Sequence, residues 1–148
     1  MSIRRDFPDL PPVWAAGTLG LQCIAAWLLP IRGFAADRIG WFLVATGLGL
    51  VGWAALKFRR HRTTIEPRET PTHLIVEGPF RINRNPIYTG MALMLVGFGA
   101  VLGTVSALLC AAIFPVIVTH RFIRGEEGDL RAAFGADADR YLDATRRW

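Results

Sequence analysis

The sequence predicts an all-α, polytopic integral membrane protein with four transmembrane helices and both termini in the cytoplasm. Three observations lead to this: long runs without charge, charged residues gathered in two polar segments, and an uneven distribution of basic residues. The averaged composition hides the pattern, because 52% hydrophobic and 20% charged residues are ordinary values for a soluble domain. Their segregation excludes a disordered chain and a disulfide-rich secreted module, and it disfavours a soluble enzyme.

Four stretches of the chain are candidates for membrane spans. A span needs about 20 mostly apolar residues, with roughly 17 as the lower limit, and residues 13–31 and 39–56 carry no charge. The uncharged run 85–119 would be about 52 Å long as one helix, which exceeds a hydrocarbon core of about 30 Å. We therefore expect it to turn back at Gly103-Thr104. The predicted single domain, 1–148, has spans over 13–31, 39–56, 87–102 and 105–122, a loop over 57–86 and a tail over 123–148.

Basic residues predict the orientation of these spans. If both termini share one side, that side holds 15 of the 17 Lys and Arg residues, including Arg4 and Arg5, and the other side holds Arg32 and Arg38. The positive-inside rule then places both termini and the loop 57–86 in the cytoplasm, as in a multi-pass protein of the cell inner membrane. This topology and attraction to anionic headgroups account for the net charge of +5 without a nucleic-acid partner.

Cysteine and histidine usage gives no sign of a metal site. Cys23 and Cys110 fall inside predicted spans and are interpreted as small apolar packing residues. The three histidines, His61, His73 and His120, are far apart in the sequence and lack a second ligand at helical spacing.

The first polar segment ends in a helix start. Gly78-Pro79 is a turn signal, and Asn85 followed by Pro86 is typical of a helix N-terminus. The third span thus begins at Pro86, and its first N–H groups with Arg84 favour an anion such as a carboxylate or phosphate. The alternative is that Arg84 and Asn85 only cap a span and reach lipid headgroups.

The second polar segment carries two adjacent carboxylates, Glu126 and Glu127, which can accept hydrogen bonds from hydroxyls or from an ammonium group. The alternative is a solvated amphipathic tail with Leu130, Phe134 and Tyr141 toward the membrane. Two spans separate the segments, so both emerge on one side and can form a composite site at the cytoplasmic interface.

At these motifs the sequence resembles the isoprenylcysteine carboxyl methyltransferase family, most closely its small bacterial members and more distantly the phospholipid N-methyltransferases. The resemblance is carried by Gly78-Pro79-Phe80, by Arg84 through Gly90, by Glu126-Glu127 and by Phe134-Gly135. It implies a membrane enzyme that transfers a methyl group from S-adenosylmethionine to a lipophilic or small carboxylate, thiol or amine acceptor. The alternatives are a phosphatidylethanolamine N-methyltransferase and, from another class, a non-enzymatic membrane protein for partner binding or assembly.

The resemblance also implies a set of site residues. Apart from the resemblance, Tyr88 and Glu127 are the candidates for a general base if the acceptor is an amine or thiol; a carboxylate acceptor needs none, and no metal is expected. The implied cofactor-binding residues are Thr72, His73, Leu74, Ile75, Phe80, Arg84, Asn85, Pro86, Ile87, Tyr88, Glu126 and Glu127.

The chain departs from the family pattern at three points. Asn85 stands where the eukaryotic enzymes have His, and aromatic residues found near Asp129 and Ala138 in many bacterial relatives are missing, while Tyr141 is kept. Four spans also offer less wall for a prenyl chain than the eukaryotic enzymes have, so a prenylcysteine acceptor is not assumed.

Overall fold

Proline and glycine set the ends of several helices in the computed structural model, which describes residues 8–33, 36–61 and 72–148. Helix α1, Pro11–Leu28, opens on two prolines, and α3, Pro86–Leu102, opens on Pro86. Proline suits the first turn of a helix because the N–H that it lacks would have no helical partner there. Helix α3 ends at Gly103, which has the left-handed φ of 66° that favours glycine.

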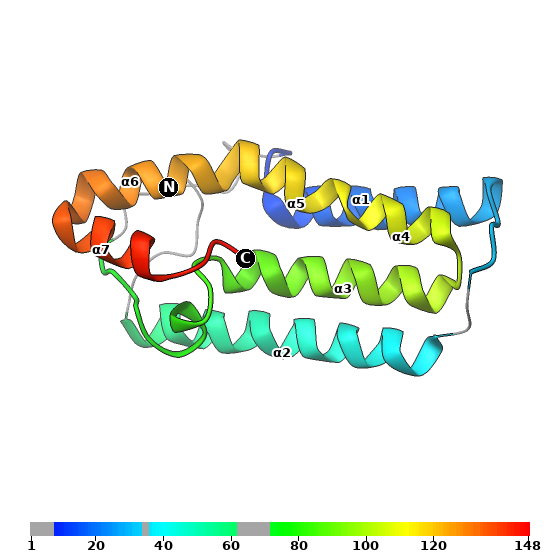
Figure 1. The fold of residues 1–148 in the computed structure, drawn as a ribbon, viewed down its shortest axis with the longest axis horizontal. Coiled ribbons are helices and arrows are strands. Elements are labelled where there is room, and N and C mark those ends of the chain that lie inside the picture. The colour runs from blue at the N-terminus through cyan, green and yellow to red at the C-terminus, as the bar shows by residue number, and fades with distance from the viewer. Residues whose placement is uncertain (1–7, 34–35, 62–71) are drawn as a thin grey trace.

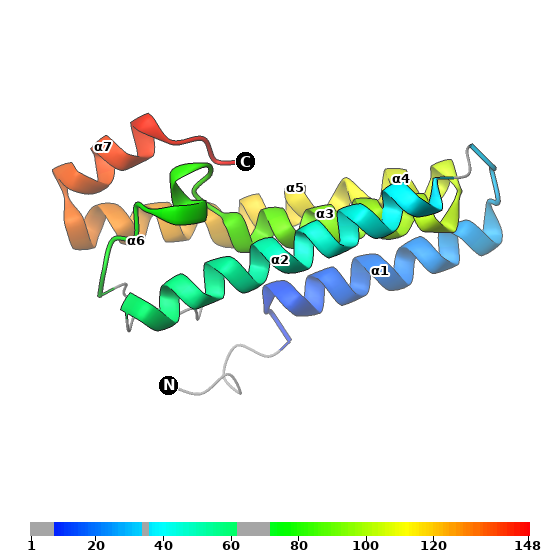
Figure 2. The ribbon, with the colours of Figure 1, turned by 90° about the horizontal axis from the view of Figure 1, so that it is seen from below.

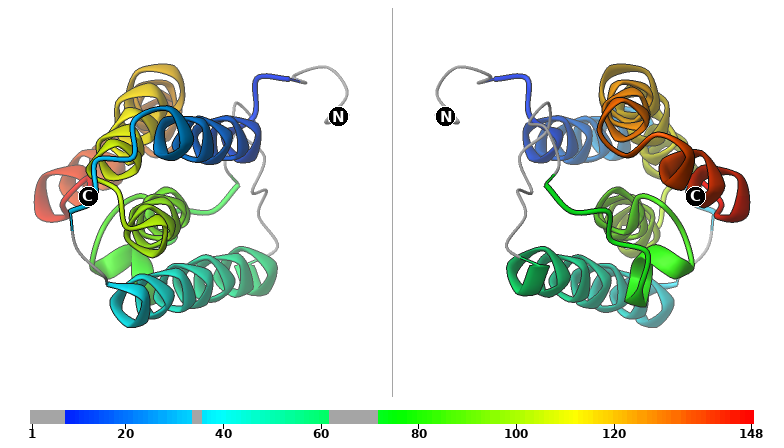
Figure 3. Two further views of the ribbon diagram at one scale, coloured as in Figure 1. Left: turned by 90° about the vertical axis from the view of Figure 1, so that its right-hand side faces the viewer. Right: turned by 90° about the vertical axis from the view of Figure 1, so that its left-hand side faces the viewer.

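Helix α3 is the central element of a bundle (Figure 1). It lies between α2, Asp37–His61, on one side and α1 with α4, Val105–Ala111, on the other (Figure 3). After α4 the chain continues through α5, Ile113–Val118, a π turn η2, Thr119–Ile123, and α6, Arg124–Phe134. At Gly135 it turns back into α7, Ala136–Ala144.

The predicted break at Gly103-Thr104 is confirmed, since Thr104 caps α4 by accepting a hydrogen bond from the Ala107 N–H at 3.3 Å. The helical structure extends beyond the predicted fourth span, 105–122. Helical structure continues to Phe134, because no proline interrupts it after the apolar run, and Gly135 ends it at a φ of 53°. The glutamate pair therefore lies on the helical stretch that contains the fourth apolar run.

Two helical stretches among the described residues are long and apolar enough to cross a membrane: α2 and the stretch 105–134. The uncharged part of the second stretch ends at Thr119, so the glutamate pair lies beyond it. Helix α3 is apolar but shorter, with 17 residues. Two spans are thus supported by length and composition, and the four-span topology stays a prediction.

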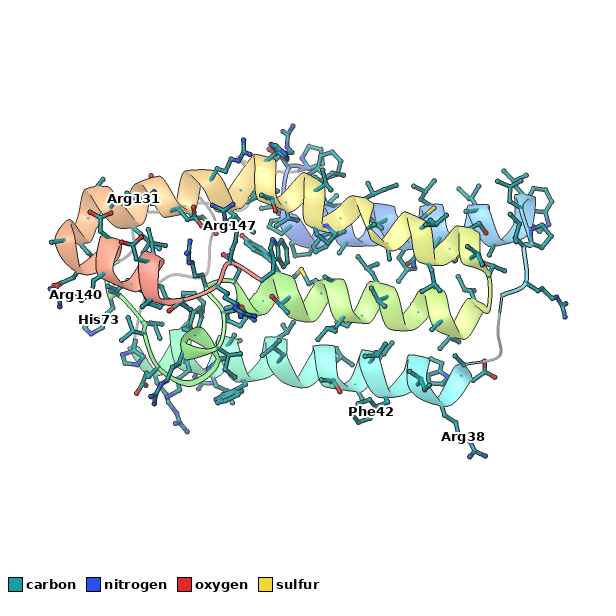
Figure 4. The ribbon with its side chains drawn as sticks, in the orientation of Figure 1. Arg38, Phe42, His73, Arg131, Arg140 and Arg147 are labelled. Carbon is teal, nitrogen blue, oxygen red and sulfur yellow. The ribbon has the colours of Figure 1, made fainter. Side chains whose placement is uncertain are left out.

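The bundle exposes large apolar side chains and buries polar ones. Trp27 is 80% exposed, Phe42 69% and Leu109 68%, and Figure 4 shows Phe42 pointing away from the bundle. Gln22 on α1 is fully buried, and its amide donates to the carbonyl oxygens of Leu95 at 2.8 Å and Ala107 at 3.0 Å. An apolar surface over helices joined by buried hydrogen bonds suits a lipid environment.

The two ends of the bundle differ in charge. At one end, here called the basic end, lie α6, α7, the C-terminus and the short 3-10 helix η1, Gly78–Arg81 (Figure 2). Figure 4 shows Arg131, Arg140, Arg147 and His73 at this end and Arg38 at the other. The predicted cytoplasmic residues Arg4, Arg5, Arg62 and Arg68 lie outside the described residues.

Glycines allow α2 and α3 to approach closely. A Cβ on Gly47 would lie 2.4 Å from the Gly90 carbonyl oxygen, and a Cβ on Gly97 would lie 2.5 Å from the Gly40 carbonyl oxygen. Each helix thus contributes two glycines seven residues apart to one seam. Contact between backbones is a common way for helices to associate in a membrane.

This seam predicts that Gly47→Ala and Gly97→Ala destabilise the bundle by about 1–3 kcal/mol, the usual cost of overpacking a close contact. Gly49 is the matched control on α2, because a Cβ there meets nothing within 4 Å. Gly49→Ala should leave stability unchanged or raise it by up to about 1 kcal/mol, since alanine favours a helix. Thermal unfolding in detergent checks this, and equal melting of Gly47→Ala and Gly49→Ala would contradict it.

Candidate functional site

At the basic end, the adjacent glutamates of α6 meet the start of α3. The Tyr88 hydroxyl donates to Glu126 Oε1 at 2.5 Å, and Arg84 Nη1 donates to Glu127 Oε1 at 3.0 Å. The structure thus brings together four predicted site residues from two distant segments of the chain.

A π turn precedes the glutamates and directs them toward α3. It covers Thr119–Ile123, and a π turn contains one residue more per hydrogen-bonded ring than an α turn. Val118, Phe122, Ile123 and Glu127 are all buried, so the buried face continues through the turn into α6. Phe122 and Ile123 pack in one apolar cluster with Tyr88, which brings α6 close to the first turn of α3.

The carboxyl group of Glu126 lies in a poorly solvated position. Burial raises its pKa, and the negative charges of Asp129 and Glu127 raise it further. The hydrogen bond from Tyr88 opposes these effects only in part, so the net shift is upward. Glu126 therefore accepts a proton more readily than an exposed glutamate does.

The pKa of Glu127 shifts in the opposite direction, although this residue is also buried, with 6% of its surface exposed. Arg147 donates to both of its oxygens, at 2.8 Å from Nε and 2.7 Å from Nη2, in addition to the contact with Arg84. Burial alone would raise the pKa of Glu127, but the two guanidinium groups outweigh it and lower the pKa. The adjacent glutamates are thus distinct, one ion-paired and ionised, the other shifted toward its neutral form.

The C-terminal residues, 145–147, form a segment that lies along residues 83–85. Asn83 and Arg146 form a parallel bridge, and the Arg84 N–H donates to the Arg146 carbonyl oxygen at 2.8 Å. The Asn85 side-chain amide donates to the Arg147 carbonyl oxygen at 3.0 Å. The C-terminal segment was not among the predicted site residues, and its contacts use mainly backbone carbonyls, which no residue pattern in the sequence marks.

Arg84, predicted as an anion-binding residue, serves several protein acceptors. Its Nε donates to the Thr145 carbonyl oxygen at 2.6 Å, its Nη2 donates to the Leu142 carbonyl oxygen, and its Nη1 holds Glu127. It therefore joins α6, α7 and the C-terminal segment to the start of α3.

At the basic end, predicted site residues from the loop before α3 pack against α2. Ile75 and Phe80 are buried with Ala54 of α2, and the Phe80 ring meets Phe58 edge to face at 5.3 Å. Ile87 packs against both this cluster and the cluster around Tyr88, so it connects the loop to the first turn of α3.

Polar side chains lie close together around residues 72–77 of that loop. His73 stacks on His61 with ring centroids 5.3 Å apart, and Glu77 accepts from Lys57 at 2.6 Å. Thr72 and His73 are exposed, Leu74 is half-buried and Pro86 is buried. Within the part of the chain that is described, no three His, Cys, Asp or Glu side chains gather where they could hold a metal ion.

Tyr141, the aromatic residue kept from the family pattern, connects α7 to η1. Its hydroxyl donates to the Phe80 carbonyl oxygen at 2.8 Å, and burial raises its pKa to about 12. Tyr141 therefore stays neutral and acts as a hydrogen-bond donor that holds α7 against the loop.

A family model described as phospholipid methyltransferase matches residues 36–137, which is more than half of the chain. The match takes in α2, α3 and the stretch with the glutamate pair, and it leaves α1 and the C-terminal segment outside. It agrees with the methyltransferase resemblance drawn from the motifs. No curated protein and no solved structure matches the chain.

The ion pairs of Glu127 predict a specific pH dependence of stability. Because its pKa in the folded protein is below the ordinary 4.5, its stabilising contribution is complete at higher pH and is lost as pH falls through the folded pKa. Glu127→Gln should therefore cost roughly 2–3 kcal/mol at pH 7, and the difference from the unsubstituted protein should shrink below about pH 4.5. Melting temperatures in detergent between pH 7 and pH 3 measure this.

Asp137 supplies the control, because its pair with Arg140 is 3.5 Å long and both side chains are more than two-thirds exposed. Asp137→Asn should change stability by less than about 1 kcal/mol at any of these pH values. A Glu127→Gln cost that stays constant down to pH 3 would contradict the assignment.

Proposed function

Because the chain belongs to the phospholipid methyltransferase family, we propose that it is a membrane enzyme that uses S-adenosylmethionine to methylate a lipophilic acceptor at the basic end. The observation that carries the proposal is the contact between Tyr88 and Glu126 beside the first turn of α3. The acceptor class of a lipophilic or small carboxylate, thiol or amine follows from the resemblance of the motifs.

The chemistry of the residues at this end fits the proposed cofactor. S-adenosylmethionine presents an ammonium group, a carboxylate and ribose hydroxyls, and it supplies an electrophilic methyl group when bound. Glu126 suits the ammonium or the hydroxyls, and Asn85 with the N-terminus of α3 suits the carboxylate. Ile75 and Phe80 are buried against α2 and support the loop beside them.

The protein's part in methyl transfer is mainly alignment and exclusion of water. A carboxylate acceptor needs no base, whereas an amine or thiol must lose a proton. Glu126 does not serve as this base, because it is assigned to the cofactor and already accepts from the Tyr88 hydroxyl. Tyr88 stays the candidate beside it. Glu127 suits the role of base less, because two guanidinium groups stabilise its ionised form.

We place this end of the bundle at the cytoplasmic face of the cell inner membrane, with four spans. The exposed apolar side chains of α1 support lipid contact beyond the two longest apolar helical stretches, α2 and 105–134. In this arrangement the soluble cofactor enters from water and the acceptor enters from the bilayer.

A second candidate function is N-methylation of phosphatidylethanolamine, which the description of the matched family favours. Purified protein with radiolabelled S-adenosylmethionine and vesicles that contain phosphatidylethanolamine tests it directly. Label in mono- and dimethylated phosphatidylethanolamine supports this candidate. Label only in added lipophilic thiols or carboxylates supports the broader proposal.

The proposed role of Glu126 predicts that Glu126→Ala abolishes measurable cofactor binding. Loss of one partner of a buried charge contact costs about 2–5 kcal/mol, which weakens affinity at least roughly 30-fold. Titration calorimetry with S-adenosylhomocysteine measures it, and Asp143→Asn, an exposed carboxylate on α7, is the control. An unchanged affinity in Glu126→Ala would rule out the assignment.

Removal of the Tyr88 hydroxyl should shift the pH at which the protein loses its affinity for the cofactor. If ionised Glu126 binds the cofactor, affinity falls as pH decreases through the pKa of Glu126, and this fall begins above the ordinary 4.5. Tyr88→Phe removes the hydrogen bond that lowers this pKa, so the fall should move to higher pH. Dissociation constants of S-adenosylhomocysteine from pH 4.5 to 8.5 measure the shift, and movement to lower pH would refute the assignment.

A further inference from the structure

We propose that Glu127 is a positioning residue that fastens the C-terminal segment, 145–147, to the start of α3 and so holds Arg84 and Asn85 in place for the cofactor. The inference rests on the proposed function and goes beyond it, because it makes the last residues of the chain part of the site.

The anchor of this arrangement is the carboxylate of Glu127. Arg147 reaches it with two nitrogen atoms and Arg84 with a third, so two cations share one ionised group. Without Glu127 the two guanidinium groups would repel each other at one end of the bundle. The carboxylate is therefore what allows the C-terminal segment to lie beside residue 84.

The C-terminal segment in turn holds the residues that begin α3. Its carbonyl oxygens accept the Arg84 N–H at 2.8 Å and the Arg84 Nε at 2.6 Å. The Arg147 carbonyl oxygen accepts the Asn85 amide at 3.0 Å, which orients the Asn85 side chain. Asn85 precedes the helical turn that contains Tyr88, so the fastened segment acts on the site through Arg84 and Asn85.

Two neighbouring arginines provide a matched pair of variants. The Arg147 side chain holds Glu127, whereas the Arg146 side chain is exposed and its residue contributes backbone contacts. Arg147→Ala removes the ion pair with Glu127 and keeps the backbone contacts, and Arg146→Ala removes a similar charge and keeps both the ion pair and the backbone contacts. A difference between them reports the ion pair and not the general loss of basic charge.

The experiment is calorimetric titration of the intact protein in detergent with S-adenosylhomocysteine, which gives a dissociation constant and a stoichiometry for each variant. We expect Arg147→Ala to raise the dissociation constant about 10-fold or more with unchanged stoichiometry, and Arg147→Lys to recover part of this loss. Arg146→Ala should stay within about twofold of the unsubstituted protein. Because the two residues act as one unit, Glu127→Gln with Arg147→Ala should bind about as weakly as Glu127→Gln alone.

Several outcomes would overturn the proposal. One is an Arg147→Ala dissociation constant equal to that of Arg146→Ala. Another is a lower stoichiometry of Arg147→Ala at unchanged affinity, which indicates a role in folding. A third is a double variant whose dissociation constant rises by the product of the two single effects.

If the unsubstituted protein binds no S-adenosylhomocysteine, the proposed function fails, and amide hydrogen exchange tests the fastening separately. Exchange at Arg84 and Thr89 should then be faster in Arg147→Ala than in Arg146→Ala, by about 10-fold. Equal exchange in the two variants refutes the fastening.

Discussion

The carboxylate of Glu127 is the constraint on which the architecture of the basic end depends. Four chain segments meet there: α6, α7, the residues before α3 and the C-terminal segment. Arg84 and Arg147 bring two positive charges to this point, and a buried carboxylate that receives three hydrogen bonds from them neutralises the repulsion. Charged groups are tolerated out of water only when they are paired and hydrogen-bonded, so removing Glu127 leaves two guanidinium groups without the carboxylate that they share.

Adjacent residues on a helix point in different directions, and this separates the roles of the two glutamates. Successive positions are rotated by about 100°, so Glu126 reaches Tyr88 while Glu127 reaches the arginines. Burial without a cation raises the pKa of Glu126, and burial between two cations lowers that of Glu127. Two identical neighbouring side chains thus differ in character: Glu127 is a structural anchor, and Glu126 accepts a proton more readily. The π turn before them sets the helical register that directs each to its own partners.

The helices and their breaks could be predicted from local patterns, because Pro86 and Gly103 act on their own backbone. The meeting of Tyr88 with Glu126 followed from motif and topology together. The continuation of the fourth helix to Phe134 and the C-terminal segment were not predicted. A π turn has no residue signature, and carbonyl acceptors belong to every residue, so these features depend on tertiary contacts that the sequence pattern does not carry.

The position of the site follows from the way the bundle is held together. Along the membrane-facing part, α2 and α3 meet through glycines, and the buried amide of Gln22 joins α1 to α3 and α4. These contacts are compact and leave apolar side chains outward. At the basic end the residues before α3 are polar, and the ion pairs of Glu127 hold the chain segments together there in place of close glycine contacts. The candidate site therefore lies directly beside the exposed apolar surface, an arrangement that suits the proposed transfer from a soluble cofactor to a lipophilic acceptor.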